Sequence, residues 1–212
     1  MYRERLTITL DAELLQAVDA LVDGESLRNR SQTIEHLLKE GIGLHRLDQA
    51  FLFLYPDYEP SRPEALVRLM AAAGIKTIYL VSFIGQPTEL AISIGQLVPE
   101  ATVSAVPSDF GSGGALLLKH AELDAPFLIA RADASRTPLP TGLLTPYVFH
   151  RQHQAPLTSL LCPRQDGYAS AGLWIADPSL LASIPAGIVS LEDSVFPVLL
   201  KEAKVRAYPF TT

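Results

Sequence analysis

Residues 50–55 read Ala-Phe-Leu-Phe-Leu-Tyr, an unbroken apolar run whose length is typical of a buried β-strand. From this run to the end of the chain, predicted strands and helices alternate. Further strands are expected at residues 77–83, 101–106, 126–131, 157–162, 171–175 and 204–208, and helices at 63–73, 88–97, 111–120, 143–154, 178–184 and 194–201. Such alternation implies a largely parallel sheet that is covered on both faces. The sequence therefore predicts an α/β domain over residues 50–212.

The residues upstream of this domain have a different pattern. Residues 5–10 alternate as Arg-Leu-Thr-Ile-Thr-Leu, which predicts a strand with one apolar face. Asp11 is a candidate N-cap for a first helix, and Asn29 for a second. A strand and two short helices cannot bury enough apolar surface alone, and the strand would leave its backbone groups unpaired. Because pairing of two copies removes both difficulties, we predict a homodimer or a higher even oligomer through residues 1–45.

The composition limits the classes of protein that fit this chain. Apolar residues make up 48% of its 212 residues and the net charge is -6, so a nucleic-acid contact would need a local basic patch. The single cysteine, Cys162, cannot form an intrachain disulfide. No apolar run approaches the ~20 residues that span a bilayer, and the start of the chain does not read as a signal peptide. These features predict a cytoplasmic protein without a membrane partner.

Residues 3–43 resemble the ribbon-helix-helix DNA-binding repressors of the CopG, Arc and MetJ types. The resemblance rests on the alternating strand at residues 5–10 and on the polar start of the second helix, Asn29-Arg30-Ser31-Gln32. It implies a β-α-α module that forms an intertwined dimer and lays its two-stranded ribbon in the major groove of double-stranded DNA. The candidate DNA-binding residues are Arg3, Arg5, Thr7 and Thr9 in and before the ribbon, and Arg28, Asn29, Arg30 and Ser31 around the helix start.

Residues 50–210 resemble the sugar-1-phosphate nucleotidyltransferases, which have a Rossmann-like sheet. The resemblance is carried by six segments: residues 63–78, 111–116, 127–133, 172–175, 191–197 and 207–210. It implies that the glycine-rich segment Gly111-Ser112-Gly113-Gly114 contacts a nucleotide or sugar-phosphate ligand. It also implies that Asp133 corresponds to a metal-binding aspartate of the family.

Three departures from that family bear on catalysis. Residues 55–63 stand where the family has a glycine-rich triphosphate loop, but they contain no glycine, and Asp57 and Glu59 would repel an anion. The family's Glu-Lys-Pro sugar-binding element is absent near residues 162–164, and its second metal-binding aspartate would lie beyond Thr212. We therefore expect no catalytic residue, no metal and no cofactor, with ligand binding at residues 111–114 and Asp133 retained.

Taken together, these patterns predict a sequence-specific DNA-binding transcriptional regulator whose degenerate second domain senses a ligand or drives assembly. Two alternatives stay open. One is an active sugar-phosphate nucleotidyltransferase with an N-terminal dimerisation module. The other is an antitoxin-like or partition-type adaptor whose large domain binds another protein. The glycine turn at 111–114 and Asp133 also have a purely structural interpretation, as a tight strand-to-helix turn and a turn carboxylate.

Overall fold

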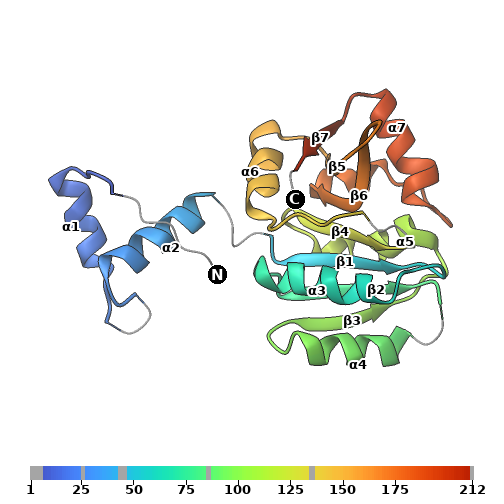
Figure 1. Cartoon of the computed structure of the whole chain (residues 1–212), viewed down its shortest axis with the longest axis horizontal. Coiled ribbons are helices and arrows are strands. Elements are labelled where there is room, and N and C mark those ends of the chain that lie inside the picture. Colours follow the sequence, from blue (N-terminus) through green and yellow to red (C-terminus); the bar gives the residue numbers. More distant parts are fainter. Residues whose placement is uncertain (1–6, 25–26, 43–46, 85–86, 134–136, 211–212) are drawn as a thin grey trace. The chain divides into compact units, whose positions relative to one another are not determined.

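The computed structural model describes residues 7–24, 27–42, 47–84, 87–133 and 137–210. The chain divides into two compact units, residues 1–44 and 45–212, which are treated separately below (Figure 1).

The small unit contains two helices, α1 (Ala12–Ala20) and α2 (Arg30–Ile42). The Asp11 carboxylate caps α1 by accepting a hydrogen bond of 2.8 Å from the Leu14 backbone N–H. The Asn29 side chain caps α2 in the same way, accepting from the Gln32 N–H at 3.0 Å. Both predicted helix starts therefore have the side-chain hydrogen bonds that the sequence indicated.

The predicted ribbon strand is not present in the described part of the small unit. Residues 5 and 6 lie outside the described residues, and residues 7–10 belong to no strand. A strand needs a neighbour to accept and donate its backbone hydrogen bonds, and the described residues of one small unit offer none. Helix α2 continues through Gly41 to Ile42.

The large unit is built on a seven-stranded sheet of order β3-β2-β1-β4-β6-β5-β7. The strands are β1 (Gln49–Leu54), β2 (Thr77–Ser82), β3 (Thr102–Val106), β4 (Phe127–Ala132), β5 (Leu157–Arg164), β6 (Gly167–Ala176) and β7 (Val205–Pro209). Strands β1 to β4 are parallel, β5 and β7 are parallel to each other, and β6 is antiparallel to both β4 and β5. The expected α/β fold with a mixed, Rossmann-like sheet is confirmed.

One hairpin in this sheet differs from the sequence prediction. The sequence predicts no strand at residues 167–170, but these residues pair with β5 across a tight turn between Arg164 and Gly167. These residues are mostly solvent-exposed, so they lack the apolar pattern by which the other strands were found. Gly167 has a backbone φ of +126°, a conformation that favours glycine.

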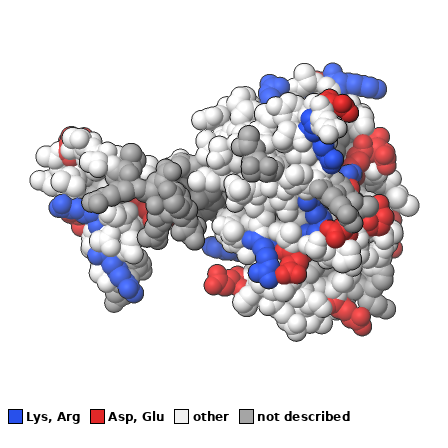
Figure 2. Space-filling view, viewed as in Figure 1, with Lys and Arg blue, Asp and Glu red and all other residues white. Residues whose placement is uncertain are grey.

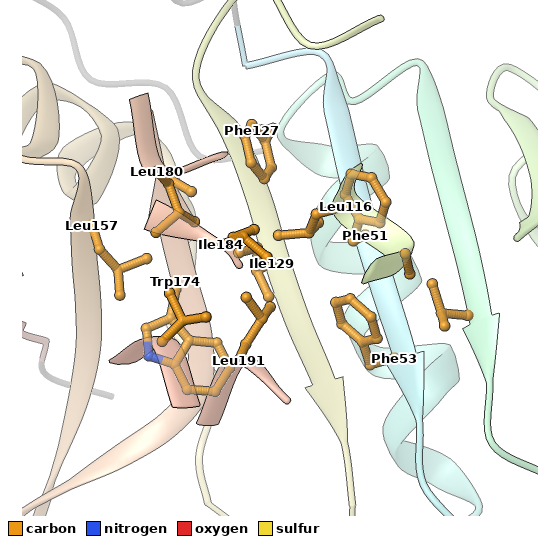
Figure 3. Close-up of a cluster of buried hydrophobic side chains, with 14 of the residues drawn as sticks. Phe51, Phe53, Leu116, Phe127, Ile129, Leu157, Trp174, Leu180, Ile184 and Leu191 are labelled. Atoms are coloured by element: carbon orange, nitrogen blue, oxygen red, sulfur yellow. The ribbon is translucent and has the colours of Figure 1, made fainter. Parts of the chain in front are cut away.

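Helices and short turns cover both faces of the sheet. The helices are α3 (Ser61–Ala72), α4 (Pro87–Leu97), α5 (Gly111–Leu118), α6 (Leu144–His153) and α7 (Phe196–Lys201), with short turns η2 (His120–Glu122), η3 (Pro178–Ser183) and η4 (Leu191–Val195). On one face, side chains of α5, η3, η4 and α7 pack onto Phe51, Phe53, Ile129 and Trp174 (Figure 3). Helices α3 and α4 contact β1, β2 and β4, whose alternate residues are also buried. Burial on both faces explains why β1 reads as a continuous apolar run.

Helix α6 carries a buried histidine, His150, which is 2% exposed. Its Nδ1 lies 2.9 Å from the Thr158 hydroxyl oxygen on β5, within hydrogen-bond distance. Burial lowers the pKa of His150 from 6.5 to about 4. The imidazole is therefore neutral in the folded protein at neutral pH.

We predict that His150 makes the fold sensitive to acid. Between pH 6.5 and about 4 the unfolded chain binds a proton at this residue that the folded chain does not, so stability is lost as the pH falls through this window. The loss should approach about 3 kcal/mol at the bottom of the window. Denaturant unfolding at pH 7 and pH 4.5 measures it. The pH-dependent loss should shrink in His150→Gln and persist in His153→Gln, which changes an exposed histidine on the same helix; equal losses in both variants would contradict the assignment.

Candidate active site

A cleft of about 270 Å³ lies at the carboxyl ends of β1 and β4. It is lined by Tyr55, Asp57, Arg131, Asp133, Ser190, Glu192 and Asp193. Tyr55 directly follows β1 and Asp133 follows β4, while residues 190–193 come from the start of η4. The carboxyl edge of parallel strands is where open α/β sheets bind their ligands.

Glu192 is held by hydroxyl groups from two other elements. The Tyr55 hydroxyl donates to Glu192 Oε1 at 3.1 Å, and the Ser112 hydroxyl donates to Oε2 at 3.2 Å. The Ser112 oxygen also accepts from the Leu191 N–H at 2.8 Å. Burial and the neighbouring Glu192 carboxylate raise the pKa of the Tyr55 phenol, so Tyr55 stays protonated and remains a donor. In the sequence, Glu192 lies within the segment 191–197 that resembles the nucleotidyltransferases, but nothing there indicates a role for it.

Arg131 lies between two carboxylates of the cleft. Its guanidinium is 2.7 Å from Asp133 Oδ2 and 3.8 Å from Glu192 Oε1. The guanidinium carbon lies 5.9 Å from the centre of the Trp174 ring, a cation–π contact with the core. Its Nε is buried and has no hydrogen-bond partner. Sequence reasoning missed Arg131, although a lone cation within the apolar run 127–132 was a visible signal.

The glycine turn at residues 111–114 serves close packing. The Gly113 N–H donates to the Val189 carbonyl at 2.8 Å, and the Val189 N–H donates to the Phe110 carbonyl at 2.9 Å. A Cβ on Gly111 would lie 2.4 Å from the Val189 carbonyl oxygen. Of the predicted ligand-binding residues, Asp133 lines the cleft and Ser112 reaches it through Glu192. The three glycines lie against the segment around Val189 and do not line the cleft.

The stretch at residues 55–63 is anchored by a buried arginine, Arg62, which is 6% exposed. Its guanidinium donates to the carbonyl oxygens of Thr137, at 2.5 Å, and Ala171, at 2.7 Å. Arg62 therefore ties the start of α3 to two later segments. It does not line the cleft and is not available there to a phosphate group.

The cleft does not fit a protein-bound divalent metal in this arrangement. No three His, Cys, Asp or Glu side chains in the described parts of the chain are grouped so that they could hold a metal ion. Asp133, the residue that the family resemblance associates with metal, is ion-paired with Arg131. The positive charge between the cleft carboxylates is thus a guanidinium.

Some of the side chains proposed for DNA contact lie outside the described residues, and Asn29 and Arg30 make contacts within the small unit. Arg3 and Arg5 are outside the described residues, and Thr7 and Thr9 are exposed but in no strand. Arg30 forms a two-pronged ion pair with Asp19 of α1, at 2.5 and 2.7 Å. On the face of the large unit seen in Figure 2, basic side chains lie among acidic ones and do not form one patch.

No protein-family model and no curated protein matches this chain. Its fold is nevertheless found among solved structures. HddC from Yersinia pseudotuberculosis is 13% identical with a TM-score of 0.53, covering 76% of this chain and 90% of its own. The inositol-1-phosphate CTP transferase from T. maritima is 11% identical with a TM-score of 0.53, covering 78% and 86%. Glucosyl-3-phosphoglycerate synthase from Mycobacterium tuberculosis, solved with Mn²⁺ and uridine diphosphate, is 15% identical with a TM-score of 0.54, covering 81% and 72%.

The large unit therefore has a nucleotidyltransferase- or glycosyltransferase-like α/β fold. This finding corrects the expectation of a non-enzymatic, DNA-binding transcriptional regulator. The named transferases among these structures are enzymes, and none of the three is named as a DNA-binding protein. No helix in the described residues is long and apolar enough to cross a membrane.

We predict that Gly111 is required for the packing at residue 189. Gly111 has a φ of +72°, and Gly74 a φ of +82° with no atom within 4 Å of an added Cβ. Alanine at either position carries the same left-handed backbone strain, but only Gly111→Ala also meets a backbone oxygen. The free energy of unfolding of Gly111→Ala should therefore lie about 1–3 kcal/mol below that of Gly74→Ala, which is the usual effect of overpacking. Chemical denaturation of both variants measures this difference, and equal stabilities would show that the close approach carries no cost.

Proposed function

We propose that the large unit is a sugar-phosphate nucleotidyltransferase, with its reaction centre in the cleft at the ends of β1 and β4. The observation that carries this proposal is the placement of Arg131, Asp133 and Glu192 together at that edge, in a fold shared with known transferases. In such a reaction, an oxygen of the sugar phosphate attacks the α-phosphorus of a nucleoside triphosphate. A new P–O bond forms, and the bond to the leaving pyrophosphate breaks.

The cleft residues suit separate parts of this reaction. The Arg131 guanidinium offers charge-assisted N–H donors to phosphate oxygens, where negative charge must be balanced as the leaving group departs. Asp57 and Asp193 are exposed at the cleft, and their carboxylates can accept hydrogen bonds from sugar hydroxyls. Because the Tyr55 and Ser112 hydroxyls hold both oxygens of Glu192, that carboxylate has a fixed position beside Arg131.

We predict that the chain releases pyrophosphate when it is given the right nucleoside triphosphate together with a sugar 1-phosphate. A coupled pyrophosphate assay over the common triphosphates and a panel of sugar phosphates tests this. Glu192→Gln should lower the turnover at least tenfold, because the carboxylate beside Arg131 is lost. Glu202→Gln, which changes an exposed carboxylate paired with Lys204, should leave turnover unchanged. If no pair of substrates reacts, and none binds in calorimetric titration at millimolar concentration, the proposal is wrong.

We further propose that the small unit is a dimerisation module of the ribbon-helix-helix type, with residues 5–10 of two copies paired. Among its described apolar side chains only Val18 is buried, at 2% exposure. Ile8, Leu14, Leu21, Leu37 and Leu38 are 39–56% exposed. A module of this size has too little core to be stable alone, and a second copy would cover these side chains. The domain division at residues 1–45 and 50–212 belongs to this proposal.

We predict a dimer at micromolar concentration, measured by light scattering coupled to size-exclusion chromatography. Because the exposed leucines would be buried between copies, Leu14→Asp combined with Leu38→Asp should give a monomer. Ile188→Asp, at an 81% exposed position of the large unit, should remain a dimer. A monomeric wild-type chain, or a double variant that stays dimeric, is the outcome that rules out this interface.

A further inference from the structure

We propose that Arg131 is a built-in cation that takes the place of a protein-bound divalent metal in the cleft. In this arrangement the described residues supply no ligand set for Mg²⁺ or Mn²⁺, and replacing Arg131 with a neutral residue opens such a site. The part of this inference that concerns phosphate ligands rests on the proposed function, whereas the part that concerns metal does not.

The first argument is the position of the guanidinium. It lies between the carboxylates of Asp133 and Glu192, 2.7 Å from one and 3.8 Å from the other. A divalent metal needs carboxylate oxygens at about 2.0–2.6 Å and would have to enter the space that the guanidinium fills. The same carboxylates cannot serve both cations at once. Among the described residues, no three His, Cys, Asp or Glu side chains form a metal-holding group, although several carboxylates line this cleft.

The second argument is that the core holds Arg131 in this place from behind. Trp174, which is 6% exposed, packs among the core residues and presents its ring to the guanidinium. Gly172 on β6 also makes room for it, because a Cβ at Gly172 would lie 3.2 Å from the Arg131 carbonyl oxygen and 3.6 Å from the Arg131 Cβ. Gly172 has a φ of +71°, which favours glycine. Trp174 and Gly172 thus both lie against Arg131, and neither of them lines the cleft.

The third argument concerns the two inner carboxylates. The side chains of Asp133 and Glu192 are 17% and 22% exposed, so water screens their charges only in part. Glu192 is further held in place by Tyr55 and Ser112, and the Asp133 backbone carbonyl accepts from the Glu59 N–H at 3.1 Å. Without Arg131, these two fixed and partly buried carboxylates would lose the guanidinium that lies between them. Oxygen donors that are fixed at close range are what hard divalent cations bind.

This arrangement has a consequence for the proposed reaction. A metal that enters with the triphosphate would be held by the phosphates of that ligand, and the protein would meet the phosphate charge with Arg131. The 3.8 Å separation from Glu192 leaves the guanidinium with donor capacity that this neighbour does not use.

Titration of the protein with Mn²⁺ alone tests the inference, with bound metal measured by electron paramagnetic resonance. The wild-type chain should bind no Mn²⁺ up to 1 mM, and Arg131→Met should bind it at least tenfold more tightly. Arg131→Lys keeps the cation and should behave as wild type, as should the exposed-site control Arg206→Met. Adding Asp133→Asn to Arg131→Met should abolish the new site.

Thermal unfolding with and without Mn²⁺ gives a second measurement if Arg131→Met is less stable. The metal should raise the melting temperature of Arg131→Met alone, because it binds only the folded state of that variant. Mn²⁺ binding by the wild-type chain as tight as by Arg131→Met would overturn the inference, as would a folded Arg131→Met chain that binds none. Neither result depends on turnover, so failure of the proposed nucleotidyl transfer in the pyrophosphate assay is a separate outcome.

Discussion

Burial of strand β1 on both faces is the constraint on which the rest of the large unit depends. Residues 50–54 are each at most 1% exposed and pair with β2 on one side and β4 on the other. A polar side chain along this strand would lose its hydration without a partner, so polar chemistry is confined to the strand ends. Tyr55 and Asp133 are the first polar side chains beyond the carboxyl ends of β1 and β4. The position of the cleft therefore follows from the burial of the central strands.

The same core also sets the shape of the cleft. The aromatic residues of β1 pack against α5, and α5 begins at the glycine turn on which the segment around Val189 lies. That segment leads directly into η4, which brings Glu192 to the cleft. Ser112 joins the two by accepting from the Leu191 N–H and donating to Glu192. A chain of close backbone contacts thus connects the glycine turn to the position of one carboxylate.

Much of this fold could be predicted from the sequence, because its strands and helices have strong local patterns. Strands β1, β2 and β4 are mostly apolar and buried, and both helices of the small unit have capping residues that form the expected hydrogen bonds. The first half of β6 could not be predicted, because residues 167–170 are held by pairing with β5 and not by apolar burial. Strand formation at residues 5–10 would likewise depend on a partner strand, which the sequence of one chain cannot supply.

The cleft was harder to predict, because the roles of its residues depend on contacts between distant segments. The glycines at 111–114 have the pattern of a phosphate-binding turn. In the structure, however, Val189 packs so closely against Gly111 and Gly113 that a side chain at either position would collide with it. The resemblance pointed to Asp133, but it did not point to its partner Arg131. The ion pair between them depends on how the Arg131 side chain is oriented at the end of β4. Glu192 gains its neighbours only through Tyr55 and Ser112, which lie 137 and 80 residues away in the chain.

The two arginines near the carboxyl edge show why the missing glycine loop does not by itself decide whether the cleft is active. Arg62 lies in the stretch where the related transferases have that loop, but it is buried and hydrogen-bonded to backbone carbonyls, so it fixes the fold. Its burial lowers its pKa, in keeping with a cation that is kept from water. Arg131, on β4, is 30% exposed and, among the described residues, is the one basic side chain that lines the cleft. A glycine loop binds phosphate through backbone N–H groups, whereas a guanidinium binds it through charge and paired donors. Loss of the first mode therefore leaves the second available, and in the proposed transferase the second mode would be supplied by Arg131.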